Sequence, residues 1–258
     1  HSTDISAIVA RELLLFAPDF VIYFAGMNEF KNLLLELSGY QTGNEEMPKE
    51  KSGFLKNHSA IYRRLKRVQT RQAEEPPQPG YKLNWPLNAD GKPSLDFQKA
   101  PKTIKTIVNN LYKIKAGVDT TKAELVVVSF VKMVKDKMIL NRTIHDGLYR
   151  YWNRQMWPYT YADIAKFSHL QNRIYETFCH NSGSIFIDLA ALYPLNPHLF
   201  LDGVHTTNAG TKLRAWIVFN QLVPILDKKL SSGELPKEAR QTLDAVSYTH
   251  LRAHETHN

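Results

Sequence analysis

An aspartate and a histidine lie three residues apart in the stretch FLDGVHTTNAG, residues 200–210. Asp202 and His205 place a carboxylate and an imidazole on one glycine-containing loop, and an apolar, helix-like stretch follows at once. An imidazole has an ordinary pKa close to neutral, and a nearby carboxylate can hold it in one tautomer. The pair therefore has the residue types of a general base, although Asp-x-x-His taken alone also arises by chance in loops.

Asn28 is a third candidate, because it presents an amide just past an unbroken apolar run, FVIYFAG at residues 20–26. Gly26 is expected to allow a tight exit from that run. Taken alone, Asn28 also fits an ordinary helix cap. In open α/β sheets, ligands bind outside the carboxyl ends of the strands. We therefore expect Asn28, Asp202 and His205 to converge at that edge of a sheet.

Three continuous apolar runs are predicted to be strands covered on both faces, as in a parallel sheet under helices. They are residues 20–26, 124–133 and 184–190. Helices are predicted before, between and after these runs. They are residues 3–16, 101–115, 161–180 and 207–230. This alternation predicts an α/β fold, a three-layer, doubly wound and mostly parallel sheet.

One domain is predicted over residues 1–230, with an insertion at about 40–100 in which residues 74–96 are rich in Pro, Gly, Asn and Asp. Residues 231–258 are predicted to form a tail. Its last part, VSYTHLRAHETHN at residues 246–258, resembles translated sequencing-adapter sequence and is left out of the fold prediction. The single cysteine, Cys179, excludes an internal disulfide and is predicted to be a buried thiol.

The net charge of +8 is concentrated locally, since residues 49–71 are strongly basic. Residues 54–72 are predicted to form a basic amphipathic helix, and its charged side is interpreted as a surface exposed to solvent. Zinc-ligand spacing, RNA-binding aromatic motifs and glycine-rich phosphate loops are not found in the sequence, so no metal, cofactor or nucleic acid is expected. Association of this helix with a membrane surface stays open, as does salt-sensitive binding of nucleic acid.

Two segments resemble sequence blocks of the SGNH (GDSL-like) hydrolases. PDFVIYFAGMNEF, residues 18–30, resembles their third block, a buried strand ending in Gly-x-Asn-Asp/Glu, and residues 200–224 resemble their fifth block, Asp-x-x-His before a turn and a helix. The resemblance extends from His1 to about Leu230. It implies a flavodoxin-like sheet and a Ser-His-Asp triad, with His205 as the base, Asp202 as its partner and Asn28 as an oxyanion donor.

The sequence departs from this family at its nucleophile. The Gly-Asp-Ser block is absent, and Glu29 stands where Asp is commoner. The resemblance implies that the first strand, the serine and the second-block glycine lie upstream of His1. Ser2, Ser6 and Ser129 are interpreted as cap, helix-face and strand residues, and none is assigned as the nucleophile.

The expected function is a serine-type ester hydrolase, an acyl esterase, lipase-like enzyme or carbohydrate O-deacetylase. Its expected substrate is a small-molecule or carbohydrate acyl ester, with membrane association through an upstream segment left open. The chain by itself is expected to be inactive. Two alternatives stay open: a non-catalytic binding module of SGNH-like fold, and a metal site formed by Asp202, His205 and His198.

Overall fold

The structure is a computed structural model that describes residues 18–26, 30–38, 83–86, 95–121, 123–156 and 159–235. Its sheet has three parallel strands in the order β1-β2-β3. The strands are Phe20–Tyr23, Glu124–Val128 and Ile185–Ile187. Their register pairs Val21 with Leu125 in one ladder and Val126 with Ile185 in the other. The predicted α/β architecture with a parallel sheet is confirmed.

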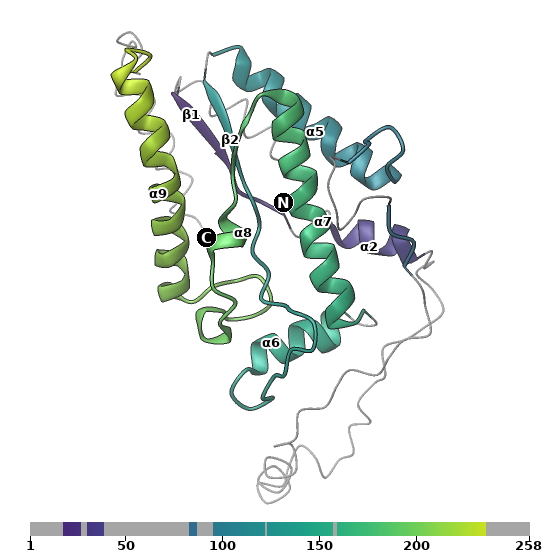
Figure 1. The fold of residues 1–258 in the computed structure, drawn as a ribbon. Helices are drawn as coiled ribbons and strands as arrows, with labels where there is room; N and C mark the ends of the chain where they lie inside the picture. Colours follow the sequence, from purple (N-terminus) through teal and green to yellow (C-terminus); the bar gives the residue numbers. More distant parts are fainter. Residues whose placement is uncertain are drawn as a thin grey trace, which may run out of the picture.

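Helices cover both faces of this sheet, with α5 and α7 on one side and α9 on the other (Figure 1). The α-helices are α2 (Phe30–Ser38), α5 (Lys102–Asp119), α6 (Asp146–Arg150), α7 (Tyr161–Ser182), α8 (Leu189–Leu192) and α9 (Asn208–Ser231). A π-helical turn, η2 (Tyr151–Gln155), continues α6, and a 3-10 turn, η3 (Pro197–Leu199), precedes the candidate site. The connections β1–β2 and β2–β3 therefore run through helices on one face, as parallel strands require.

Local capping explains why α7 matches its predicted range. The hydroxyl of Thr160 accepts a hydrogen bond from the N–H of Asp163 at 3.1 Å, and the Asp163 carboxylate accepts one from the N–H of Thr160 at 3.2 Å. This capping box satisfies two N–H groups at the helix start. Gly183 ends the helix with φ of 67°, a conformation that favours glycine. The predicted helices at 101–115 and 207–230 are likewise confirmed, as α5 and α9.

The apolar runs extend beyond the strands that they predicted. The second strand ends at Val128, so the interpretation of Ser129 as a strand residue is wrong. Its hydroxyl donates a hydrogen bond to Asp188 at 2.8 Å and accepts one from the N–H of Ala190 at 2.8 Å. The following residues, 130–134, form a largely buried loop. A continuous apolar run indicates that a segment is buried on all sides. A buried loop and a buried strand therefore have the same sequence pattern.

Several predictions lie outside the described residues. They include the helices at 3–16 and 54–72, most of the insertion at 40–100, the tail beyond residue 235, and Asn28, Ser2 and Ser6. The described parts of the insertion pack onto the domain, since Leu83 and Leu95 are buried in the core. Cys179 is buried as predicted, and burial raises the pKa of its thiol to about 12. Among the helices of the described ranges, none combines the length and apolarity needed to cross a membrane.

Glu36 of α2 caps the start of α5 from a distant point in the sequence. Its carboxylate accepts hydrogen bonds from the backbone N–H groups of Lys102 at 2.7 Å and Thr103 at 2.8 Å. Partial burial acts to raise the pKa of Glu36, but the bonds from Thr103 and Lys102 lower it by more. A negative charge at this end also complements the helix dipole. Glu36 therefore supplies the cap that Pro101, at the N-cap position, does not.

We expect Glu36→Ala to lower the free energy of unfolding by about 1 kcal/mol, because two N–H groups at the start of α5 lose their partner. Urea unfolding followed by circular dichroism measures the change. Asn32→Ala, at an exposed position of the same helix, is the matched control and should leave stability near that of the original protein. Equal stability of the two variants would contradict the capping role.

Candidate functional site

The loop that carries Asp202 and His205 is closed on itself by backbone contacts. Phe200 and Thr206 form an isolated antiparallel bridge, and the N–H of Leu201 donates to the carbonyl of His205 at 2.8 Å. Thr207 then begins α9, its hydroxyl accepting from the N–H of Gly210 at 3.2 Å. The tight loop and the helix cap together fix where the two side chains start. The sequence prediction placed both residues on one loop, and the structure confirms that placement.

Asp202 and His205 form a direct pair. Oδ2 of Asp202 lies 2.7 Å from Nδ1 of His205. Oδ1 accepts hydrogen bonds from the backbone N–H groups of Val204 and His205, each at 2.8 Å. One carboxylate thus orients both the loop backbone and the imidazole ring. The i, i+3 spacing makes this possible, because the turn folds the histidine back over the aspartate.

Hydrogen bonding keeps the Asp202 carboxylate charged. Partial burial acts to raise its pKa, but the N–H groups of His205 and Val204 and the ring of His205 lower it below the ordinary 3.8. An ionised partner at Nδ1 holds a proton on that nitrogen and leaves Nε2 as the basic atom. Nε2 has no hydrogen-bond partner among the described residues, and the His205 side chain is 73% exposed. The pair therefore presents a free basic nitrogen outward.

The lowered pKa of Asp202 makes its contribution to stability depend on pH. Its folded value lies below 3.8, so the contribution is fully present above that value and is lost as the pH falls through the folded pKa. We expect the unfolding free energies of the original chain and of Asp202→Asn to differ at pH 7 and to converge as the pH falls through the folded pKa of Asp202, because asparagine does not titrate. Urea unfolding at a series of pH values measures this. A difference that stays constant down to pH 2 would contradict it.

Gly203 lies against two aromatic rings of η2. A Cβ at this position would stand 2.3 Å from Cζ2 of Trp152 and 2.5 Å from Cδ1 of Tyr151. The carbonyl of Gly203 accepts a hydrogen bond from the N–H of Met133 at 2.9 Å, and Nε1 of Trp152 donates to the carbonyl of Met133 at 2.8 Å. The glycine thus allows the loop of residues 200–206, called the acid-base loop after the carboxylate of Asp202 and the imidazole of His205, to lie directly on η2 and on the loop after β2. Burial, together with the charge of Asp202, raises the pKa of Tyr151 to about 12, consistent with this contact.

We expect Gly203→Ala to destabilise the chain by about 1–3 kcal/mol, the usual cost of forcing a methyl group into a packed site. The ring of Trp152 cannot withdraw easily, since this residue is 1% exposed. Thermal unfolding measures the loss. Gly233→Ala is the contrasting variant, because a Cβ there meets nothing within 4 Å and its cost arises only from the positive φ of 75°. A smaller loss for Gly203→Ala than for Gly233→Ala would contradict the packing argument.

Gly26 lies at the carboxyl end of β1, against α7. A Cβ there would stand 2.0 Å from Nε2 of Gln171 and 3.0 Å from the hydroxyl of Tyr175. That hydroxyl donates a hydrogen bond to the carbonyl of Ala25 at 3.0 Å. A glycine here therefore allows the chain to approach α7 closely, and the predicted tight exit from the strand stays a prediction.

The end of β1 and the acid-base loop meet at one side chain of α9. Nη2 of Arg214 donates hydrogen bonds to the carbonyls of Val204 at 3.1 Å and Val131 at 3.4 Å. Its guanidinium lies 5.8 Å from the ring centroid of Phe24, the residue that follows β1. Asn28 itself lies outside the described residues, so its predicted convergence with His205 stays a prediction.

His198 contacts a different histidine. Its ring packs edge-on against His145, with centroids 5.6 Å apart. Within the ranges that the structure describes, no three His, Cys, Asp or Glu side chains are grouped so that they could hold a metal ion. The alternative of a metal site formed by His198, Asp202 and His205 is therefore not supported by their placement.

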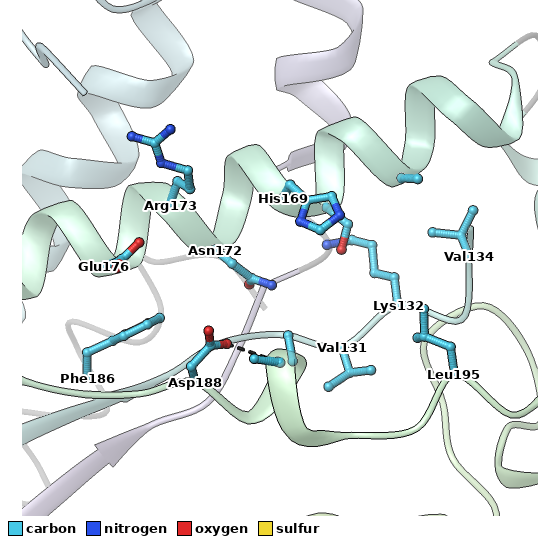
Figure 2. Close-up of a pocket in the computed structure, with 14 residues that line it drawn as sticks. Val131, Lys132, Val134, His169, Asn172, Arg173, Glu176, Phe186, Asp188 and Leu195 are labelled. Carbon is cyan, nitrogen blue, oxygen red and sulfur yellow. Dashed lines mark hydrogen bonds between the residues drawn. The ribbon is translucent and has the colours of Figure 1, made fainter. Parts of the chain in front are cut away.

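A pocket of about 210 Å³ lies at the carboxyl ends of β2 and β3 (Figure 2). Its walls come from the loop after β2, from α7 and from the segment after β3. Residues from these three parts include Lys132, Asn172 and Asp188. Asn172 is fixed by two hydrogen bonds to the backbone of Phe130, at 2.8 Å and 3.1 Å. The pocket occupies the edge where ligands bind in open α/β sheets.

Lys132 is the residue in this pocket that sequence reasoning missed. It belongs to the apolar run FVKMV, residues 130–134, yet it is only 2% exposed. Nζ donates a hydrogen bond to Oε1 of Gln171. A lysine inside an otherwise apolar run was the available signal, because lysine is almost never fully buried without a partner.

The chain matches no protein-family model, no curated protein and no solved structure.

Proposed function

We propose that Asp202 and His205 are the acid-base pair of a serine-type ester hydrolase related to the SGNH family. The observation that carries this proposal is the 2.7 Å contact between Oδ2 of Asp202 and Nδ1 of His205, with Nε2 left open. The carboxylate is anchored by two backbone N–H groups, so the imidazole has a fixed partner. This is the arrangement that activates a hydroxyl nucleophile in other serine hydrolases.

In the proposed reaction, Nε2 of His205 takes the proton from a serine hydroxyl as the oxygen attacks the ester carbonyl. The same nitrogen then returns the proton to the leaving alcohol. Asp202 stabilises the imidazolium that exists between these two steps and keeps the proton of Nδ1 in place. Water repeats the sequence in deacylation.

The nucleophile and part of the oxyanion hole are proposed to lie upstream of His1, on a strand that pairs with β1. Three features support this. Among the described strands β1 is at the edge of the sheet; Ile22 in β1 and Phe24 after it are 49% and 41% exposed, and Trp216 and Phe219 are exposed on α9. A further strand and helix would cover these apolar groups and complete a flavodoxin-like sheet. The side-chain amide of Asn28 is proposed as one oxyanion donor. Its N–H would stabilise the negative charge that develops on the carbonyl oxygen in the transition state.

The proposed substrates are acyl esters of small alcohols or of carbohydrates. The mechanism needs an ester carbonyl and an alcohol that leaves with one proton, and it needs no metal or organic cofactor. Both substrate classes meet these requirements.

The test compares two proteins. One is the chain of 258 residues, and the other, called the extended protein, also carries the residues encoded directly upstream of His1. We expect the extended protein to hydrolyse p-nitrophenyl acetate and to be labelled by a fluorophosphonate, with both activities lost in His205→Ala. We expect the chain alone to do neither. A well-folded extended protein that is not labelled would overturn the proposal and favour a non-catalytic binding module.

A further inference from the structure

Two isoleucines of the loop between β2 and α6 project into solvent. Ile139 is 78% exposed and Ile144 is 66% exposed, and Leu201 in the acid-base loop is 62% exposed. Single exposed apolar residues are common on protein surfaces, but a group of large aliphatic side chains marks an interaction surface. The segment that carries the two isoleucines, residues 135–145, is called the 135–145 loop.

The end of the 135–145 loop lies against the acid-base loop. A Cβ on Gly147, at the start of α6, would clash with the carbonyl oxygen of Leu201. Directly after Ile144, the ring of His145 packs edge-on against the ring of His198, with centroids 5.6 Å apart. Figure 1 shows α6 at the same end of the molecule as the start of α9. Ile144 and Leu201 therefore belong to neighbouring parts of one surface.

Buried neighbours hold the two isoleucines in place. Met138 and Leu140, on either side of Ile139, are buried in the core. Oδ1 of Asn141 accepts a hydrogen bond from the N–H of Ile144 at 3.0 Å. A surface that is already fixed in this way loses little conformational freedom when it binds a partner.

Positive charges lie around the apolar side chains. Lys135 and Lys137 are exposed, and neither forms an ion pair with a described residue. Arg142 adds a third cation, while Asp136 is the one carboxylate of the loop, so its net charge is +2 with His145 neutral. The loop therefore attracts an anionic partner.

The chemistry of this surface suits a lipid bilayer better than a protein. Aliphatic side chains bordered by lysines can enter the headgroup region while the ammonium groups contact anionic lipids. A stable protein interface uses about 20–30 residues on each side, and it has few lysines at its centre. At the start of α6, the charges of Asp146 and Arg150 neutralise each other in an ion pair of 2.6 Å, so they do not oppose such binding.

We propose that the 135–145 loop docks the chain on a bilayer surface that contains anionic phospholipids. Ile139 and Ile144 insert between the headgroups, and Lys135 and Lys137 contact the lipid phosphates. This surface is separate from residues 54–72, and the docking does not depend on ester hydrolysis.

The test uses a dye on the loop itself. Cys179 is the single cysteine, and burial raises the pKa of its thiol to about 12, so a thiol-reactive dye labels Thr143→Cys selectively. This exposed position leaves both isoleucines in place. With vesicles of phosphatidylcholine and phosphatidylglycerol, we expect the emission of an environment-sensitive dye to shift to shorter wavelength and to be quenched by nitroxide-labelled lipids. The same dye on Leu230→Cys, an exposed position at the other end of α9, should show neither change.

Substitutions give the contributions of the apolar and charged groups. In the labelled protein, Ile139→Ser together with Ile144→Ser should weaken binding at least about tenfold, because two aliphatic side chains no longer leave water. Lys135→Gln together with Lys137→Gln should weaken it about fivefold for each lysine. Leu230→Ser and Lys228→Gln, at exposed positions near the end of α9, are the matched controls and should leave binding unchanged.

Four results would overturn the proposal. The first is the absence of a dye response at position 143 while the chain still sediments with vesicles, which would assign binding to other basic residues. The second is an equal response on Leu230→Cys, and the third is equal binding to phosphatidylcholine alone. The fourth is a response that grows with protein concentration without vesicles, which would identify an interface between two copies of the chain. The dye measurement requires no change at either isoleucine or lysine, so a substitution that impairs folding does not obscure it.

Discussion

Asp202→Asn is expected to reduce ester hydrolysis by the extended protein about ten-thousand-fold, the loss typical of a triad that keeps its shape but has the wrong tautomer. Oδ1 of the asparagine can still accept the N–H groups of Val204 and His205, so the loop stays closed. Its Nδ2, however, donates to Nδ1 of His205. The ring proton must then sit on Nε2, where it blocks the nitrogen that has to receive the serine proton.

The loss should appear in kcat, with KM nearly unchanged, because the imidazole acts on the transition state and not on substrate binding. Asp136→Asn, at an exposed position of the loop after β2, is the matched control and should retain full activity. Steady-state hydrolysis of p-nitrophenyl acetate gives both constants. An Asp202→Asn protein with more than about a tenth of the original kcat would show that Asp202 does not set the tautomer of His205 during catalysis.

Capping residues and spacing made the helices and the acid-base loop predictable. Thr160 and Asp163 mark the start of α7, and Thr207 marks the start of α9. The Asp-x-x-His spacing predicted the pairing of Asp202 with His205, since such contacts form within a few residues. These signals depend on residues a few positions apart in the sequence, so they can be recognised without knowing the fold.

Features that depend on contacts between distant segments were not predictable. Gly203 and Gly26 carry no sign in the sequence that they face Trp152 and Gln171. Likewise, α6 and η2 were not predicted, because elements of 5 residues each are too short to show an apolar period. The partners of such residues are known only once the chain is folded.

Arg214→Met is expected to have the second largest effect, lowering the free energy of unfolding by about 2 kcal/mol and speeding local opening of the acid-base loop. Arg214 connects α9 to the carbonyls of Val204 and Val131. Its guanidinium also lies 5.6 Å and 5.7 Å from the ring centroids of Tyr193 and Phe200. Methionine has a similar length and remains apolar, so the variant removes mainly these polar contacts.

Hydrogen exchange separates the effect on the loop from the effect on the whole chain. The amides of Val204 and His205 are bonded to Asp202, and we expect both to exchange faster in Arg214→Met than the global loss of stability accounts for. Lys212→Met, at an exposed position of the same helix, should change neither quantity. Arg214→Lys should fall between the two, since it keeps the charge but lacks the planar group that reaches two carbonyls.

The size of the Arg214 effect depends on two opposing contributions. Burial lowers the pKa of Arg214, and its Nε is buried without a hydrogen-bond partner among the described residues, so part of its desolvation cost is not recovered. Methionine relieves that cost, which holds the expected loss near 2 kcal/mol despite two broken hydrogen bonds. If stability were unchanged while the Val204 and His205 amides still exchanged faster, Arg214 would be a residue kept for the geometry of the loop and not for the stability of the fold. If neither changed, the link between α9, the end of β1 and the acid-base pair would be wrong.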